Sequence, residues 1–97
     1  MELTPKQRRA LRGMAHALRP VVQVGQAGVG PGVIAATAQA LDDHELVKVR
    51  LAGAEGKKAA AAALAAATDA ALCGLVGHVA ILYRPDRDAP RIVLPPG

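Results

Sequence analysis

The order of helical and strand patterns along this 97-residue chain predicts an α/β fold with the element order α-β-α-β-α-β-β. Three observations support this prediction. Apolar residues recur at helical spacing in several segments, short β-branched or alternating runs separate those segments, and glycine or proline marks most of the boundaries. Strands that alternate with helices favour a mixed sheet with helices packed on it. The length fits a single domain over residues 1–97.

The first helix is expected to begin after Thr4 and to end at about residues 16–18. Thr4 can cap the helix, Pro5 suits its first position, Gln7 completes a capping box, and Pro20 stops it. Helical spacing then places a row of basic residues beside the apolar stripe: Arg8, Arg9, Arg12, His16 and Arg19. Because solvated helix faces usually mix charge signs, this acid-free flank indicates a binding surface.

A loop with four glycines in eight residues follows the strand expected at residues 21–24. The second helix is expected to run from Pro31 to near Asp43. Bare amides in such a loop, next to a helix N-terminus, can approach a phosphate. Nucleotide-binding motifs do not fit, because Pro31 follows Gly30 where a P-loop has lysine. Val33 likewise replaces the third glycine of a dinucleotide fingerprint.

The strand expected at residues 46–52 has one apolar face and one face that carries two cations. Side chains alternate along a strand, which separates Val47, Val49 and Leu51 from Leu46, Lys48 and Arg50. The remaining expected elements are a helix at 57–70, strands at 72–76 and 79–84 joined by a tight turn, and a short edge strand at 91–94. The helix contains one large apolar residue, Leu64, so we expect it to pack closely through its alanines.

Composition excludes some classes of RNA-binding protein. The hydrophobic fraction of 52% includes 22 alanines, and Tyr83 is the only aromatic residue. RNA-recognition motifs and OB-type single-strand binders stack bases on several aromatic rings, which this chain lacks. We expect Tyr83 itself to lie in the core or in the sheet, and not to act as a stacking platform. The net charge of +4 arises entirely within residues 1–41, which favours a polyanionic partner.

Catalysis and cofactor binding find little support in the sequence. The polar residues at 42–45 are interpreted as a solvated helix end, there is no serine, and Cys73 lies in an apolar strand. The three histidines are far apart, so we expect no zinc site and no cofactor. A single cysteine and the lack of a signal-peptide or membrane-span pattern predict a cytoplasmic protein.

Binding of a nucleic-acid backbone remains as the best-supported class. The basic flank offers guanidinium groups and the glycine loop offers amides, which together can hold phosphates without base stacking. The alternative is a protein-interaction module that docks an acidic ribosomal or other protein. A DNA-binding protein is a third possibility, although no recognition-helix pattern supports it.

Three segments resemble the CRM domain family, and most closely its stand-alone bacterial YhbY-type proteins. They are the Gly25-Gln26-Ala27-Gly28 loop, residues 41–49 (LDDHELVKV) and residues 79–85 (VAILYRP), while residues 4–22 fit the family's opening. The glycine pair alone is a weak signal. The ordered combination of the other two motifs is a strong one, and the resemblance covers nearly the whole chain.

The resemblance implies an RNA-binding protein, not an enzyme, that associates with precursors of the large ribosomal subunit. Plant relatives with this domain assist intron splicing in organelles. The implied fold is a four-stranded mixed sheet with three helices on one face, similar to the C-terminal domain of translation initiation factor three. The implied partner is ribosomal RNA, and we expect a monomer that binds neither a membrane nor a small-molecule substrate.

The implied binding site combines the basic flank with a GxxG loop like that of KH domains. Family loops often carry a basic residue near the glycines, whereas this loop has Gln26 and Ala27. We therefore expect the arginines of the first helix to carry most of the electrostatic attraction. The expected RNA-binding residues are Lys6, Arg8, Arg9, Arg12, His16, Arg19, Gly25, Gln26, Ala27, Gly28, Lys48 and Arg50.

Overall fold

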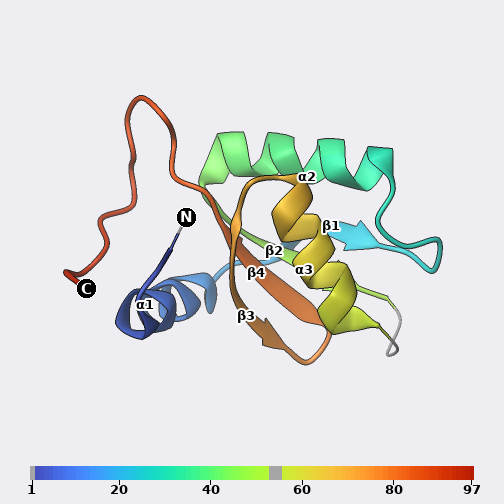
Figure 1. Ribbon diagram of the computed structural model, residues 1–97, viewed down its shortest axis with the longest axis horizontal. Helices are drawn as coiled ribbons and strands as arrows, with labels where there is room; N and C mark the ends of the chain where they lie inside the picture. The colour runs from blue at the N-terminus through green and yellow to red at the C-terminus, as the bar shows by residue number, and fades with distance from the viewer. Residues whose placement is uncertain (1, 53–55) are drawn as a thin grey trace.

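A computed structural model describes residues 2–52 and 56–97 of the chain (Figure 1). Its elements, in chain order, are α1 (Pro5–Ala15), β1 (Pro20–Val24), α2 (Pro31–His44), β2 (Leu46–Leu51), α3 (Lys57–Ala67), β3 (Ala71–Val76) and β4 (Val79–Tyr83). This order confirms the α-β-α-β-α-β-β prediction. Within the described residues, no helix combines the length and apolar character that a membrane span requires.

The strands form one mixed sheet in the order β1-β2-β4-β3. β1 pairs with β2 in parallel, through the crossover that contains α2, and the other two pairings are antiparallel. The predicted tight turn joins β3 to β4, with Gly77 at a φ of 59°. β1 is therefore an edge strand, and its free edge is the one that faces away from β2.

The helices lie on both faces of the sheet, so the expected placement of all three on one face is wrong. Buried residues of α2 and α3 pack on one face, together with Val47, Val49 and Leu82 of the sheet. α1 packs on the other face, and Figure 1 shows the sheet running between it and the α2–α3 pair. The physical reason is that both faces of the central strands carry apolar residues, and each face needs cover.

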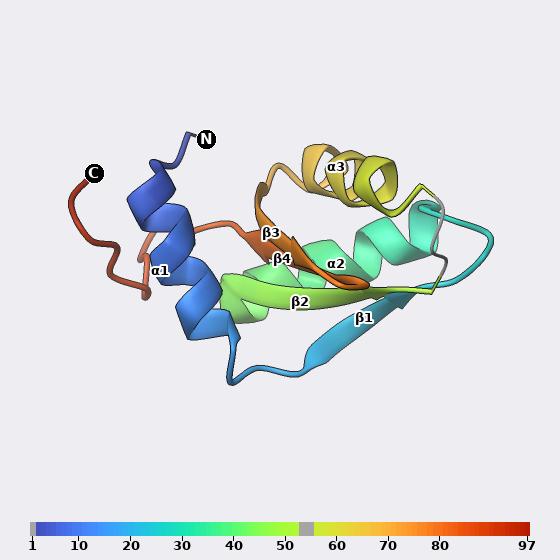
Figure 2. The same ribbon diagram turned by 90° about the horizontal axis from the view of Figure 1, so that it is seen from below.

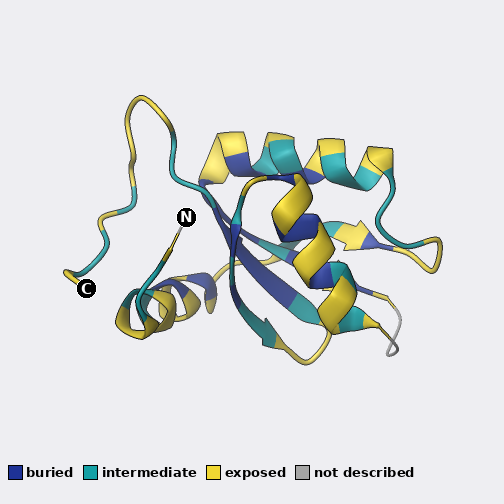
Figure 3. Cartoon of the chain, viewed as in Figure 1, coloured by how far each residue is buried: buried dark blue, intermediate teal, exposed yellow. Residues whose placement is uncertain are grey.

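The first face is closed by helices that approach the sheet through small side chains. Leu64 is fully buried and lies between the buried alanines Ala61 and Ala65 of α3. These methyl groups let the α3 backbone lie close to the sheet, as the sequence predicted (Figure 3). Leu41 of α2 completes this cluster, in which every buried member is aliphatic.

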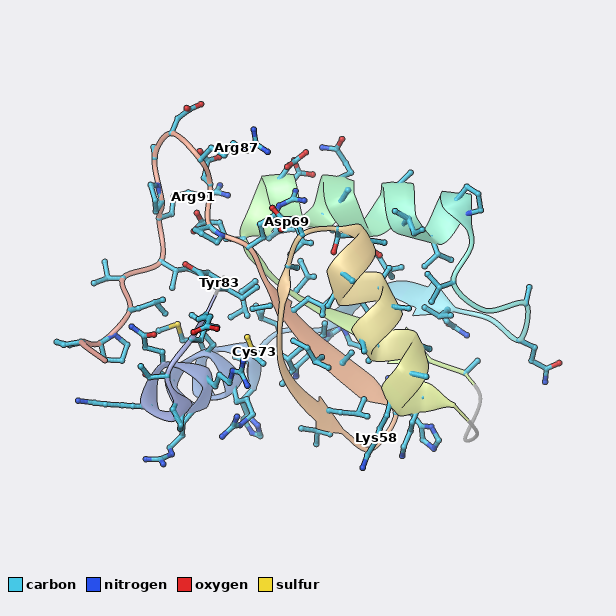
Figure 4. The ribbon with its side chains drawn as sticks, viewed as in Figure 1. Lys58, Asp69, Cys73, Tyr83, Arg87 and Arg91 are labelled. Atoms are coloured by element: carbon cyan, nitrogen blue, oxygen red, sulfur yellow. The ribbon has the colours of Figure 1, made fainter. Side chains whose placement is uncertain are left out.

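The second face is covered only in part, by α1 and by the C-terminal segment. Leu11 and Ala15 of α1 pack against Ile81 and Tyr83 of β4, and Tyr83 is 3% exposed. Tyr83 is thus a core residue, as expected, and Figure 4 shows it between β4 and the N-terminal part of the chain. The predicted capping box of α1 is present, with reciprocal hydrogen bonds of 3.1 Å between Thr4 and Gln7.

The C-terminal segment forms no strand, so the expected edge strand at residues 91–94 is wrong. The reason lies in a buried carboxylate. The backbone N–H groups of Arg91 and Ile92 donate to Glu45 at 3.0 and 2.9 Å, and the N–H of Asp86 also donates to it. Amides that serve a side chain in this way are not free to pair in a ladder. The segment instead lies against α1, where Gln7 donates to the carbonyl of Pro95 at 3.1 Å.

Candidate nucleic-acid interface

A groove separates α1 from the uncovered half of the second sheet face. We call it the α1 groove; it has a volume of about 250 Å³ and is lined by Arg12, His16, Pro20, Lys48, Arg50, Val76, Val79 and Ile81. Figure 2 shows that β1 and the adjoining part of β2 have no helix beneath them on this side. None of the described residues that line the groove is acidic. The groove is therefore a cationic hollow with an apolar floor.

Arg12 is held in place at one wall of the α1 groove. Its Nη1 donates to the carbonyl of Cys73 at 2.9 Å. Its aliphatic stem lies over Gly74, where an added Cβ would come within 2.6 Å of the Arg12 Cδ. Any side chain at Gly74 would thus displace the arginine. Arg12 is both a structural link between α1 and β3 and an exposed cation at the groove, a double role that the sequence did not predict.

Lys48 forms hydrogen bonds at the C-terminal end of α1. Its Nζ donates to the carbonyl of Leu18 at 3.0 Å and approaches that of His16 at 3.5 Å. A cation at this position compensates the partial negative charge of the helix end. Arg50, two residues further along the same face of β2, is exposed. Of the two predicted strand cations, Lys48 is hydrogen-bonded to carbonyls at the end of α1, whereas Arg50 is exposed to solvent.

The other predicted cations extend the surface in two directions from the groove. α1 ends at Ala15, so Arg19 lies in the connection to β1 and not on the helix flank, and it lines a second hollow together with Arg50. Lys6, Arg8 and Arg9 are exposed on the N-terminal half of α1. The structure thus gathers Arg12, His16, Arg19, Lys48 and Arg50 around one region, and a row of further cations leads away from it.

The GxxG loop lies at the opposite end of the molecule from α1. Both views place the loop after β1 at one end of the long axis and α1 at the other, and that axis measures 38 Å (Figures 1 and 2). The loop is a turn closed by a 3.0 Å bond from the Gly28 N–H to the Gly25 carbonyl, and Gly28 has a φ of 84°. Gln26 and Ala27 at its tip are exposed. A ligand that contacts both regions must therefore span most of this axis.

Lys57 is a cation beside the loop that the sequence analysis missed. It lines a small hollow with Gly25, Gln26 and Gly28. The signal was available in the topology, because β1 and β2 are parallel and their carboxyl ends lie at the same edge of the sheet. The segments that follow these two strands must meet there. The loop thus has a basic neighbour, although it contains no basic residue itself.

The polar turn at residues 42–45 is solvated only in part. Asp42, Asp43 and His44 are exposed, as expected, but Glu45 is fully buried, which corrects its assignment to a solvated turn. Burial by itself would raise the pKa of this carboxyl. The amides of the C-terminal segment and the nearby Arg91 guanidinium outweigh that effect, so the pKa of Glu45 is lowered. Glu45 is an ionised anchor for the chain end.

Cys73 is buried, and Arg84 is bound by other parts of the fold. Burial raises the pKa of the Cys73 thiol to about 11, against the opposing effect of nearby arginine charges, so the thiol is protonated at neutral pH. Arg84 donates to the carbonyl of Thr68 at 2.7 Å and to that of Ala38 at 3.0 Å, and it pairs with Asp42. The arginine of the VAILYRP segment therefore ties β4 to α2 and α3.

Two proteins with similar sequences carry names that refer to RNA binding. The chain is 44% identical over 95 residues to a Haemophilus influenzae protein named "RNA-binding protein", covering 96% of this chain and 95% of the relative. It is 38% identical over 95 residues to the Bacillus subtilis "Probable RNA-binding protein YqeI", covering 96% of this chain and 99% of that protein.

Structural comparison gives the same picture. The solution structure of a hypothetical protein from Staphylococcus aureus matches with a TM-score of 0.85 and 33% identity. The match covers 97% of this chain and all of the other. Residues 3–84 match the family described as the CRS1 / YhbY (CRM) domain, which is most of the chain. This protein belongs to the CRS1/YhbY (CRM) domain family.

Proposed function

We propose that this protein binds structured RNA, without catalysing a reaction, through the surface that runs from α1 across the α1 groove to the GxxG loop. The observation that carries the proposal is the grouping of five basic residues around a groove whose described lining contains no carboxylate. Such a surface fits a phosphate backbone, which supplies most of the affinity in nucleic-acid binding. The names of the relatives point to the same class of ligand.

The length of the surface favours an extended RNA over a small ligand. Its two ends lie near the opposite ends of a 38 Å axis, and the open sheet face joins them. Lys57 and the bare backbone of the loop offer contacts at one end, while Arg8 and Arg9 offer contacts at the other. Contacts so far apart suit RNA that is recognised by its shape and its phosphates.

We further propose that the RNA is ribosomal RNA in precursors of the large subunit, bound by one copy of the domain in the cytoplasm. This finer assignment rests on the resemblance of the 41–49 and 79–85 segments to YhbY-type proteins. The protein should then sediment with large-subunit precursor particles, and RNase treatment should release it. Retention after RNase treatment would instead support the protein-interaction alternative.

The proposed RNA contact is tested by the double variant Arg8→Ala/Arg9→Ala. Both side chains are exposed and alanine favours the helix, so the fold should be unchanged. RNA affinity should fall, and the slope of log Kd against log salt should decrease by about 1.4–1.8, since each phosphate contact accounts for about 0.7–0.9. The measurement is fluorescence anisotropy over a salt series. Arg12 is left intact because its loss would also detach α1 from β3.

The matched control is Lys58→Ala/Arg87→Ala, which removes the same two charges from exposed residues that lie outside α1 and do not line the α1 groove. It should leave the slope nearly unchanged, because neither side chain is among the proposed phosphate contacts. An equal change of slope in both double variants would mean that only net charge matters. In that case α1 would not be part of the interface.

A further inference from the structure

The floor of the α1 groove is apolar, which binding of phosphates does not require. Val79 and Ile81 of β4 and Val76 of β3 line it. Val76 is 63% exposed at the end of its strand, so its side chain is open to a ligand that enters the groove. The cations and the apolar side chains share one hollow. A ligand that fits it should therefore offer an apolar surface and a negative charge together.

The size of the groove limits what it can hold. Its volume of about 250 Å³ is below the range of about 300–1,000 Å³ that drug-sized ligands occupy. A folded partner cannot enter it, and a single planar group can. The Arg12 guanidinium at its wall is fixed by the Cys73 carbonyl and by Gly74 beneath its stem. A fixed, planar and weakly hydrated guanidinium is a good surface for stacking.

We propose that the α1 groove holds one unpaired nucleotide of the RNA, an inference that rests on the proposed function. The base lies against Val79 and stacks on the Arg12 guanidinium, and Arg50 meets the attached phosphate. Unstacked bases in loops and bulges are the usual targets of specific RNA recognition, and arginine planes or apolar side chains can receive them. The groove thus stacks a base without an aromatic ring.

A nucleotide fits this groove better than an acidic peptide does. Glutamate or aspartate side chains would use the cations but would leave the exposed apolar surface of Val76 and Val79 uncovered. Further exposed cations lie on the same helix as Arg12, namely Arg8 and Arg9, and Arg19 lines the neighbouring hollow beside β1. A run of cations on both sides of the hollow matches the repeating phosphates on both sides of one flipped-out nucleotide.

The test compares two RNA duplexes that are identical except for one bulged nucleotide. Wild-type protein should bind the bulged duplex about tenfold more tightly, which lies within the range that one stacked base contributes. Val76→Glu places a carboxylate at the mouth of the groove and should abolish this preference. Its matched control is Val93→Glu, a position in the C-terminal segment that is 85% exposed. It makes the same charge change and should retain the preference.

Arg50→Gln, with Arg87→Gln as its control, gives a second measurement if Val76→Glu alters the fold. Arg50→Gln should reduce the preference for the bulge severalfold, and Arg87→Gln should not. If wild-type protein binds both duplexes equally, or if Val76→Glu and Arg50→Gln both keep the preference, the subsite is overturned while RNA binding stands. If wild-type protein binds neither RNA, the proposed function itself fails. Stronger binding of a glutamate-rich peptide than of either RNA would overturn both in favour of a protein partner.

Discussion

The two faces of the sheet differ in how completely other elements cover them. The face beneath α2 and α3 is closed by aliphatic side chains, and its sheet residues Val47 and Val49 are at most 2% exposed. The opposite face is covered only in part, by α1 and the C-terminal segment, and Arg50 of β2 is open to solvent on that face. A domain of this size buries a limited share of its surface, so leaving half a face uncovered has a cost in stability. The uncovered half is where the cations gather.

The half-open face is stabilised by a segment from the far end of the chain. Ile92 and Leu94 pack beside α1, and Glu45 holds this segment through backbone amides. Glu45 has a positive φ of 64°, a conformation that usually favours glycine. The three amide donors and the buried carboxylate offset that cost. The chain end thus adds cover at one end of the face and leaves the α1 groove free.

The largest effect should come from the closed face, through Leu64→Ala. Leu64 is fully buried and is the only large apolar residue of α3. Its truncation leaves a cavity and should reduce the free energy of unfolding by about 3 kcal/mol, within the range for buried leucines. Urea denaturation measures the loss. The comparison variant on the half-open side is Leu18→Ala, which is 40% exposed and should cost less than about 1 kcal/mol. Equal losses would contradict the division between the faces.

A smaller loss should follow from Glu45→Gln, which weakens the anchor of the C-terminal segment. Glutamine offers one acceptor oxygen, whereas the carboxylate accepts from the amides of Asp86, Arg91 and Ile92. We expect a loss of about 2 kcal/mol at pH 7, because hydrogen bonds to charged groups are the stronger ones. The control Asp43→Asn makes the same chemical change at an exposed site and should have little effect. An equal loss in the control would show that Glu45 does not anchor the segment.

The same variant makes a prediction about pH. Because the pKa of Glu45 is lowered in the folded state from an ordinary value of 4.5, its contribution is fully present above that value. The contribution is lost as the pH falls through the folded pKa. The pKa of Asp86 is also lowered, by the amides of Ala89 and Asp88, so wild-type stability alone does not isolate Glu45. The difference in Tm between wild type and Glu45→Gln should shrink below about pH 4.5. A constant difference would contradict an ionised anchor.

Most of the elements could be predicted from the sequence because their signals are local. Thr4 and Gln7 define the start of α1, and the alternation of Val47 and Val49 with Lys48 and Arg50 defines the two faces of β2. The position of α1 depends on long-range packing. A helix pattern says which of its sides is apolar, but it does not say which face of the sheet that side will meet.

The candidate site likewise contains residues that local sequence signals identify and residues that only long-range contacts reveal. Charge and spacing identified the basic residues of α1, because an acid-free row is visible in one dimension. The second roles of Arg12 and Lys48 depend on backbone carbonyls of Cys73 and Leu18, which carry no sequence signal. Lys57 was missed because its place beside the loop follows from the parallel pairing of β1 and β2.

The smallest expected effect concerns Lys57, which lies on α3 and so belongs to the helices of the closed face. If the binding surface reaches around the sheet edge to the GxxG loop, Lys57→Gln should weaken RNA binding by a few fold and lower the salt slope by about 0.7–0.9, the share of one phosphate. Lys58→Gln removes the same charge one residue further along the helix, at an exposed position that does not line the loop. Fluorescence anisotropy over a salt series compares the two variants. If Lys57→Gln and Lys58→Gln have the same RNA affinity and the same salt slope, the loop end makes no specific contact. RNA binding would then be confined to the half-open face, and the contrast between the two faces would be complete.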